Sequence, residues 1–206
     1  MKKQVLLIHG GNSFPTYEDY LFDLRNMSFD MDRINSSRNR WNRNLDELLG
    51  DEFEVIMPQM PCKQNAKYLE WKIYFEKIIP FLRDGVILIG HSLGGIFLAK
   101  YLSENIFPVK IVVVYLVSAP FDDSERNDIG YSLGDFSLPE SLNELQNQVK
   151  KIFIFHSNDD LVVPIIDAHK YSEALPEAEL LIFEDKGHFM HDNFAELVKA
   201  IRKLSN

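Results

Sequence analysis

The stretch VILIGHSLGG, residues 86–95, joins a short apolar run to a serine flanked by glycines and opens an apolar, helix-favouring segment. A continuous apolar run bounded by small residues is typical of a buried strand. A serine that projects from a sharp turn between strand and helix needs small neighbours, because the two elements approach closely there. Gly90 and Gly94 meet this need on either side of Ser92. The stretch therefore has the sequence form of a nucleophile elbow.

The rest of the chain repeats the alternation of strand and helix that this stretch begins. Apolar runs recur at 5–8, 111–117, 152–155 and 180–183, with a weaker one at 53–57. Between the runs, apolar stripes at helical spacing mark 69–82 and 194–204. Strands that are apolar on both faces indicate a mostly parallel sheet covered by helices on both sides. We predict an α/β fold, a three-layer α/β/α sandwich with about six strands.

Nothing in the sequence divides the chain into parts. It has 206 residues, which is enough for one substantial core but short for two, and it shows no repeat or Gly/Ser-rich linker. We therefore expect a single domain over 1–206 with no large cap domain. Two long connections, 12–51 and 119–149, are candidates for a small partial cover. The second is predicted to end in a helix that starts near Ser137, with Pro139 in its first turn.

The charge of the chain argues against a polyanionic partner. The formal net charge is −9 at pH 7, whereas binding to nucleic acid or to an anionic membrane needs clustered Lys and Arg. We expect neither as a partner. One local basic group surrounds Trp41, and we interpret it as a solvated helix face rather than a binding patch. Its members are Arg33, Arg38, Arg40 and Arg43.

Cysteine and histidine usage argues against a disulfide or a metal site. Cys62 is the only cysteine, and the six histidines show no H-x-x-x-H or H-E-x-x-H spacing. We expect no metal and no cofactor. The run at 5–8 is too short for the core of a signal peptide, and no stretch approaches the ~20 apolar residues that span a bilayer. These features favour a cytoplasmic protein.

Polar residues that follow the apolar runs supply the groups of a nucleophilic site. Ligands bind parallel sheets beyond the carboxyl ends of the strands, which is where these residues fall. A serine hydroxyl needs an imidazole to take its proton, and a carboxylate then orients the ring. The order Ser92, Asp160, His188 is the order in which such groups follow one another in a hydrolase sheet. These three residues are our predicted nucleophile, acid and base.

Other residues compete for the same roles. The alternatives are Asp159, Asp122 and Asp123 for the acid and His191 and His156 for the base. Of the adjacent pair 159–160, one carboxylate should face the imidazole and the other should be solvated or should cap a turn. We interpret His191 as the start of the last helix and His156 as a structural hydrogen-bonding residue.

The substrate oxygen and the acyl group need further contacts. We predict that the backbone amide of Leu93 stabilises the developing oxyanion, together with an amide from Gly11 or Asn12. Aromatic side chains in the long connections are candidates for lining the acyl pocket. They are Tyr17, Tyr20, Trp41 and Phe121.

Four motifs together resemble those of the α/β-hydrolase superfamily. They are Ile8-His9-Gly10-Gly11, Gly90-His91-Ser92-Leu93-Gly94-Gly95, Asp160-Leu161-Val162-Val163-Pro164 and Gly187-His188-Phe189. The small size is similar to that of the compact serine hydrolases related to retinoblastoma-binding protein 9 and of bacterial esterase-like proteins. The resemblance implies Ser92 as nucleophile, Asp160 as acid and His188 as base. The chain departs from larger members in lacking the first antiparallel strands, and Leu161 stands where a proline often follows the acid.

These features lead to one functional hypothesis and one rival. The first is a cofactor-independent serine hydrolase that cleaves a small carboxylic ester or thioester, so that its partner is a small-molecule acyl substrate. The elbow carries Ser92 rather than the carboxylate that epoxide hydrolases and haloalkane dehalogenases need. The rival is an interaction protein that keeps the hydrolase fold but binds a partner with little hydrolysis, since a fold does not determine a function.

Overall fold

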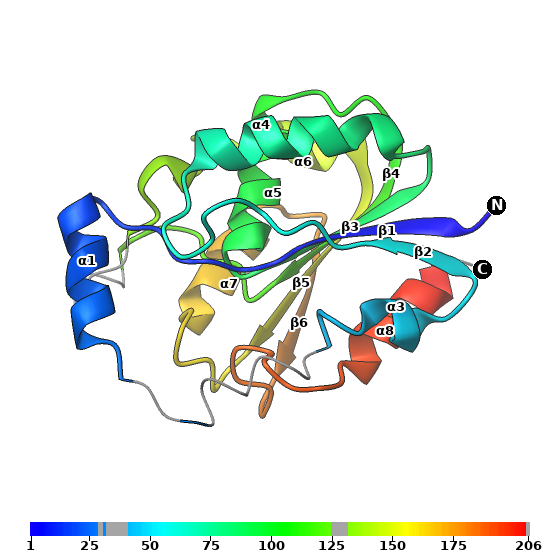
Figure 1. Ribbon diagram of the computed structural model, residues 1–206. Helices are drawn as coiled ribbons and strands as arrows, with labels where there is room; N and C mark the ends of the chain where they lie inside the picture. Colours follow the sequence, from blue (N-terminus) through cyan, green and yellow to red (C-terminus); the bar gives the residue numbers. More distant parts are fainter. Residues whose placement is uncertain (29–30, 32–40, 125–131, 205–206) are drawn as a thin grey trace.

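A parallel sheet forms the middle layer of the molecule (Figure 1). The computed structural model describes residues 1–28, 31, 41–124 and 132–204. Within these residues the sheet has six strands in the order β2-β1-β3-β4-β5-β6, and every neighbouring pair is parallel. The strands are β1 (Lys3–Ile8), β2 (Phe53–Ile56), β3 (Val86–His91), β4 (Ile111–Val117), β5 (Val149–Ser157) and β6 (Glu179–Phe183). The six predicted apolar runs are thus confirmed as strands.

Helices cover both faces of the sheet. One face carries α4 (Tyr68–Ile78), α5 (Leu93–Glu104), α6 (Asn143–Gln148) and α7 (Ile165–Ala174), and the other carries α3 (Leu45–Leu49) and α8 (Ala195–Leu204). The remaining α-helix given for the described residues, α1 (Tyr17–Asn26), buries none of its residues. Two short 3-10 turns, η1 (Ile79–Phe81) and η2 (Gly134–Phe136), complete the described elements. The arrangement confirms the predicted three-layer sandwich.

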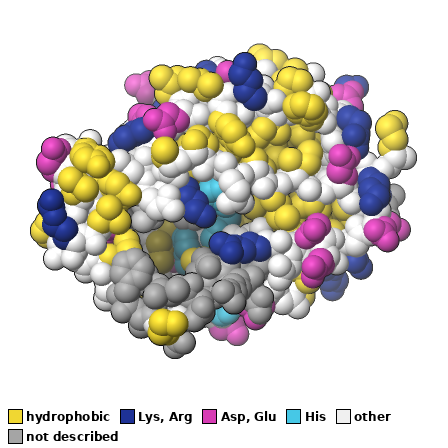
Figure 2. All heavy atoms as spheres, in the orientation of Figure 1, with side chains coloured by type: hydrophobic (Ala, Val, Ile, Leu, Met, Phe, Trp, Pro, Cys, Tyr) yellow, Lys and Arg dark blue, Asp and Glu magenta, His cyan; other side chains and the backbone are white. Residues whose placement is uncertain are grey.

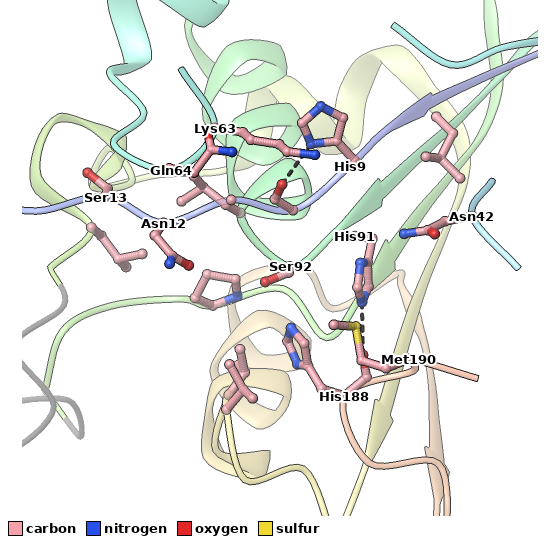
Figure 3. Close-up of a pocket in the computed structure, with 18 of the residues that line it drawn as sticks. His9, Asn12, Ser13, Asn42, Lys63, Gln64, His91, Ser92, His188 and Met190 are labelled. Atoms are coloured by element: carbon pink, nitrogen blue, oxygen red, sulfur yellow. Dashed lines mark hydrogen bonds between the residues drawn. The ribbon is translucent and has the colours of Figure 1, made fainter. Parts of the chain in front are cut away.

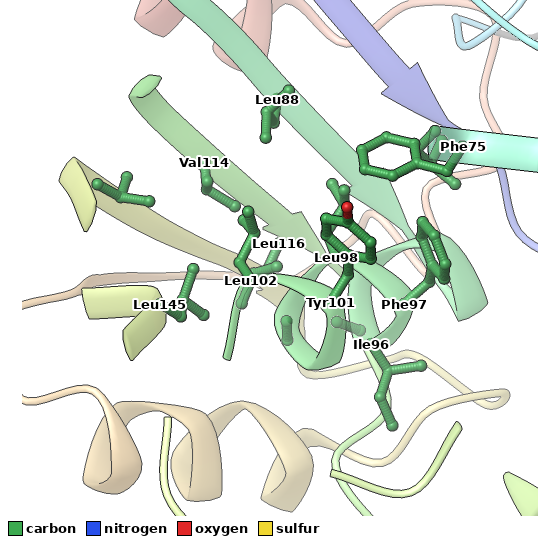
Figure 4. Close-up of a cluster of buried hydrophobic side chains, with 14 of the residues drawn as sticks. Phe75, Leu88, Ile96, Phe97, Leu98, Tyr101, Leu102, Val114, Leu116 and Leu145 are labelled. Atoms are coloured by element: carbon green, nitrogen blue, oxygen red, sulfur yellow. The ribbon is translucent and has the colours of Figure 1, made fainter. Parts of the chain in front are cut away.

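Alternating residues of each strand pack into two separate cores. In β3, Val86 and Leu88 point into the core beneath α4 and α5, and Ile87 and Ile89 point into the core beneath α3 and α8. Because both faces are buried, the strand is apolar at every position rather than at every second one. Figure 4 shows part of the first core, where α5 contributes side chains from Ile96 to Leu102.

The parallel register brings the carboxyl ends of the strands to one edge. Ile8 pairs with Gly90, His91 with Val117, and Ser157 with Phe183. The residues that follow β1, β3, β4, β5 and β6 therefore lie near one another. Figure 2 shows a hollow on this face of the molecule, with histidine side chains visible inside it.

Two helix boundaries differ from the prediction. The stripe over 69–82 is interrupted after Ile78, because Pro80 lacks the amide that would continue the helix. Leu69, which we placed on that stripe, is 62% exposed. The connection 119–149 does end in a helix, α6, but this helix starts at Asn143 rather than near Ser137, because Ser137 ends η2 and its hydroxyl donates to the Gly134 carbonyl.

The last helix also starts later than predicted. His191 lies four positions before α8, in a bend, so it does not begin that helix. The backbone carbonyl of His191 instead accepts a hydrogen bond from the Trp41 amide, at 3.0 Å. Among the described residues, none of the helices combines the length and the apolar character needed to cross a membrane.

Candidate active site

Ser92 occupies a strained turn between β3 and α5. Its φ is 54° and its ψ is −125°, a conformation that residues with a side chain rarely adopt. The Ser92 amide donates to the Val117 carbonyl at 2.8 Å, which ties the turn to β4. A Cβ atom on Gly94 would lie 2.2 Å from the Ile8 carbonyl oxygen, and one on Gly90 would lie 2.5 Å from the Gly94 oxygen. The small residues are therefore required by the close approach of backbone segments.

Asp160 and His188 form a hydrogen-bonded pair at the ends of β5 and β6. The His188 Nδ1 lies 2.9 Å from Asp160 Oδ2, and the Asp160 side chain is fully buried. The other carboxylate oxygen accepts hydrogen bonds from the amides of Val162 and Val163, at 2.8 and 3.0 Å. Because the carboxylate can only accept, Nδ1 carries the proton and Nε2 is left as the basic atom.

The carboxylate of Asp160 is held in its charged form. Burial alone would raise its pKa, but the hydrogen bond and charge of His188, the Val163 amide and the Ser118 hydroxyl lower it to about 2. Ser118 follows β4 and is completely buried, and its Oγ donates to Asp160 Oδ2 at 2.8 Å. Asp160 is thus ionised at neutral pH and can stabilise a positive charge on the imidazole.

Asp159, the neighbouring carboxylate, makes different contacts. Its Oδ1 accepts hydrogen bonds from the Ser157 hydroxyl at 2.5 Å and from the Gly187 amide at 2.8 Å. The Ser157 hydroxyl oxygen in turn accepts the Lys186 amide at 3.0 Å. Asp159 therefore anchors the backbone of the loop that carries His188, whereas Asp160 contacts its ring.

Ser92 and His188 line the same cavity, which has a volume of about 740 Å³. Figure 3 shows the Ser92 side chain and the His188 ring facing each other across its floor. No hydrogen bond joins the Ser92 hydroxyl to the His188 ring in this structure. Such a bond is often long before substrate binds and shortens in the complex.

Of the three amides predicted for the oxyanion, those of Leu93 and Gly11 remain candidates. Leu93 is the first residue of α5, so its amide has no carbonyl in a preceding turn to bind. Asn12 is a correction, because its amide donates to the Lys63 carbonyl at 2.8 Å. Gly11 lines the cavity, and a Cβ there would lie 2.6 Å from the same carbonyl oxygen. The Gly11 amide is therefore the remaining candidate from that turn.

The histidines around Ser92 and Asp160 act as hydrogen-bonding supports. His9 accepts the Met60 amide on Nε2 and donates from Nδ1 to the Gly10 carbonyl. His91 donates from Nε2 to the carbonyl of His188, at 2.9 Å. His156 is fully buried and donates to the Val163 carbonyl. Burial lowers the pKa of both His9 and His156, which keeps their rings neutral.

The aromatic side chains expected in the acyl pocket lie elsewhere. Trp41 is 1% exposed, and its indole donates to the Phe189 carbonyl at 2.8 Å, so it belongs to the core beneath α8. Phe121 packs on a ring of α7, and Tyr17 and Tyr20 pack on each other along α1. None of the four lines the cavity. A loop aromatic can satisfy its burial in the nearest core, and Trp41 does so, whereas Tyr17 stays 61% exposed on α1.

The other acid candidates have hydrogen-bond partners other than His188. Asp122 accepts hydrogen bonds from the Lys170 ammonium, and Asp123 accepts the Leu133 amide. Of the basic group around Trp41, Arg33, Arg38 and Arg40 lie outside the described residues. Arg43 is described and lines the cavity.

The structure adds site residues that the sequence reasoning missed. Ser118 supports Asp160, but a serine after a strand carries no pattern that marks such a role. The residues after Asp160 form one wall of the cavity, and Leu161 is 95% exposed there. Lys63 faces the cavity from the segment between β2 and α4. In the described part of the chain, no group of three or more His, Cys, Asp or Glu side chains is arranged to hold a metal ion.

A parallel sheet whose third strand in the chain leads through a strained serine turn into a buried helix defines an α/β hydrolase. The family model for serine hydrolases matches residues 34–205, and the chain belongs to that family. Serine hydrolase RBBP9 of Rattus norvegicus is 27% identical over 152 residues, which cover 74% of this chain and 78% of that protein.

Solved structures share the fold over the whole chain. The ydeN gene product of Bacillus subtilis superposes with a TM-score of 0.75 at 17% identity, covering 99% of both chains. The esterase domain of a Rhodothermus marinus protein has a TM-score of 0.60 at 16% identity, covering 98% of this chain and 86% of that one. The protein is therefore a hydrolase with an α/β-hydrolase fold.

Proposed function

We propose that this hydrolase cleaves a small carboxylic ester or thioester through an acyl-enzyme on Ser92. One observation carries the proposal. His188 is bound through Nδ1 to the ionised Asp160, while Ser92 projects from a strained turn into the same cavity. This arrangement leaves Nε2 as the base on the side of the hydroxyl.

The reaction follows from these positions. Ser92 Oγ attacks the carbonyl carbon as its proton passes to His188 Nε2, and Asp160 stabilises the resulting imidazolium. The amides of Leu93 and Gly11 stabilise the negative oxygen of the tetrahedral intermediate. The imidazolium then gives its proton to the departing alcohol or thiol. Water repeats the sequence on the acyl-enzyme and releases the carboxylic acid.

Covalent labelling tests the proposal most directly. A fluorophosphonate probe reacts with a serine only if a neighbouring base activates it, and intact-mass measurement counts the adducts. We expect one adduct on the wild-type protein and none on Ser92→Ala or His188→Ala, with turnover of short-chain p-nitrophenyl esters lost in parallel. Ser103→Ala is the matched control, because Ser103 lies on the same helix but its hydroxyl bonds within that helix, to the Ala99 carbonyl.

The opposite result has a clear meaning. A folded wild-type protein that gives no adduct and no turnover would overturn the proposal and favour the interaction role. An adduct that persists in Ser92→Ala would place the nucleophile elsewhere. We also propose a cytoplasmic location, because the run at 5–8 is too short for the core of a signal peptide and the single cysteine, Cys62, is compatible with a reducing compartment.

A further inference from the structure

Two cationic side chains face the cavity that holds Ser92. Lys63, between β2 and α4, and Arg43, just before α3, both line it. Lys63 is half-buried and Arg43 is exposed. Among the described residues that line the cavity there is no aspartate or glutamate. The described wall is therefore positively charged, although the whole chain carries a net charge of −9.

Lys63 and Arg43 differ from many other cationic side chains of the described residues, which form ion pairs. Elsewhere many described cations have a carboxylate partner within 4 Å, namely those of Lys2, Arg83, Lys100, Lys151, Lys170 and Lys186. No ion pair and no side-chain hydrogen bond is formed by Arg43 or Lys63 with any described residue. Both charges are therefore available to a ligand in the cavity.

The charges of Lys63 and Arg43 both act on the same side chain, His9. Burial is the main reason that the pKa of His9 is lowered, and the positive charges of Lys63 and Arg43 lower it further. Figure 3 shows the Lys63 ammonium beside the His9 ring, with Gln64 next to it. Further amide side chains that line the cavity can donate hydrogen bonds to an anion. They are Asn12, Asn42, Gln59 and Gln64.

The topology sets Lys63 on a definite side of Ser92. In the sheet, β2 and β1 lie on one side of β3, and β4, β5 and β6 lie on the other. Lys63 follows β2 and its carbonyl binds the turn after β1 through Asn12, whereas His188 follows β6. The leaving group must receive its proton from His188, so it departs on the β6 side. The acyl group then extends toward Lys63, and Arg43 adds its charge on this side because it also acts on His9, which follows β1.

We infer that Lys63 and Arg43 form a subsite for a carboxylate at the far end of the acyl group, so that the preferred substrates are half-esters or half-thioesters of dicarboxylic acids. This inference rests on the proposed function, because it assigns the acyl side from the direction of proton transfer. Charge-assisted hydrogen bonds to an anion are stronger than neutral ones, which gives two cations the means to select it. An anion there also meets no described carboxylate on the wall.

A matched pair of substrates tests the inference. Hydrogen 4-nitrophenyl adipate and its methyl ester have the same scissile bond and differ in the distant carboxylate. We expect kcat/KM to be at least about tenfold higher for the charged compound, which is the size of one hydrogen bond to a charged group. The preference is a ratio within one protein, so any general loss of activity cancels.

Variants then locate the origin of the preference. Lys63→Gln and Arg43→Gln should each lower the ratio by about fivefold to tenfold, and the double variant should abolish it. Lys77→Gln removes the same charge from the exposed side of α4 and should leave the ratio unchanged. A second pair, 4-(butanoyloxy)benzoate and its methyl ester, carries the charge on the leaving group and should show no preference.

Three outcomes would overturn the inference. They are a wild-type ratio near one, a ratio that survives in the double variant, and a preference for the charged leaving group. Calorimetric titration of Ser92→Ala with monomethyl adipate separates this failure from that of the proposed function. Binding that is lost with Lys63→Gln, without ester turnover by the wild type, would support the anion subsite and reject the esterase. Turnover through Ser92 without any charge preference would support the esterase and reject the anion subsite.

Discussion

Replacing Asp160 with asparagine tests the acid of the proposed site through stability and activity together. The pKa of Asp160 is lowered from 3.8 to about 2 in the folded protein, although burial by itself would raise it. A lowered pKa means that ionisation stabilises the folded state above the unfolded pKa. That stabilisation is lost as the pH falls from about 4 through about 2. The shift corresponds to about 2 kcal/mol at pH 7.

The measurement is a comparison of urea unfolding for wild type and Asp160→Asn over a pH series. At pH 7 we expect the variant to be less stable by about 2 kcal/mol, because asparagine lacks the charge that His188 and Ser118 stabilise. The difference should shrink below pH 4 and be largely gone near pH 2, where about half of the wild-type carboxyl is protonated in the folded state and nearly all of it in the unfolded state. A difference that stays constant over this range would refute the reasoning.

Activity gives the second half of the same test. Asparagine cannot stabilise the imidazolium of His188, so we expect kcat to fall on the order of 10³- to 10⁴-fold. Asp159→Asn is the matched control, because its oxygen can still accept the Gly187 amide. Asp159→Asn should lower kcat by less than about tenfold, which is the effect of one weakened hydrogen bond. Equal losses in the two variants would mean that the acid is assigned to the wrong residue.

Two further predictions concern the residues around this site. Ser118→Ala removes one hydrogen bond from Asp160, so the pKa of Asp160 should rise from about 2 and kcat should fall by about tenfold; an unchanged pH dependence of unfolding would contradict this role. Gly94→Ala would place a Cβ 2.2 Å from a backbone oxygen, so it should lower the free energy of unfolding, measured in urea, by more than ~3 kcal/mol. Gly85→Ala, at φ +92° with open space around it, should cost only about 1 kcal/mol, and similar losses in both would disprove the steric argument.

The sheet was predictable because its central strands are buried on both faces. A run such as 111–117 is apolar at every position, and only a covered parallel strand demands that. Helix ends were less predictable, because they depend on single residues and on tertiary contacts. Pro80 stops α4 locally, whereas the last helix of the 119–149 connection starts at Asn143 instead of near Ser137, after η2, which packs against α4 and α5.

Some residues of the candidate site could be predicted from the sequence and others could not. Ser92 and His188 stand in motifs whose glycines reflect local backbone demands, so their places were visible in the sequence. Trp41 was expected in the pocket but lies in the core, where its indole binds the Phe189 carbonyl. The sequence did not show this contact because the two residues are 148 positions apart. Ser118 went unnoticed for the same reason, since its partner Asp160 follows a different strand. Contacts between distant strand ends leave no periodicity in the chain.

The adjacent positions of Asp159 and Asp160 limit how the turn after β5 can evolve. One residue fastens the backbone of the His188 loop and the next binds the imidazole. Inserting or deleting a single residue in this turn would displace both contacts at once, and a substitution elsewhere could restore only one of them. We therefore expect related chains to show no insertions or deletions at residues 157–160. Differences in length should instead fall in the connections that line the cavity on the side of Lys63 and Arg43.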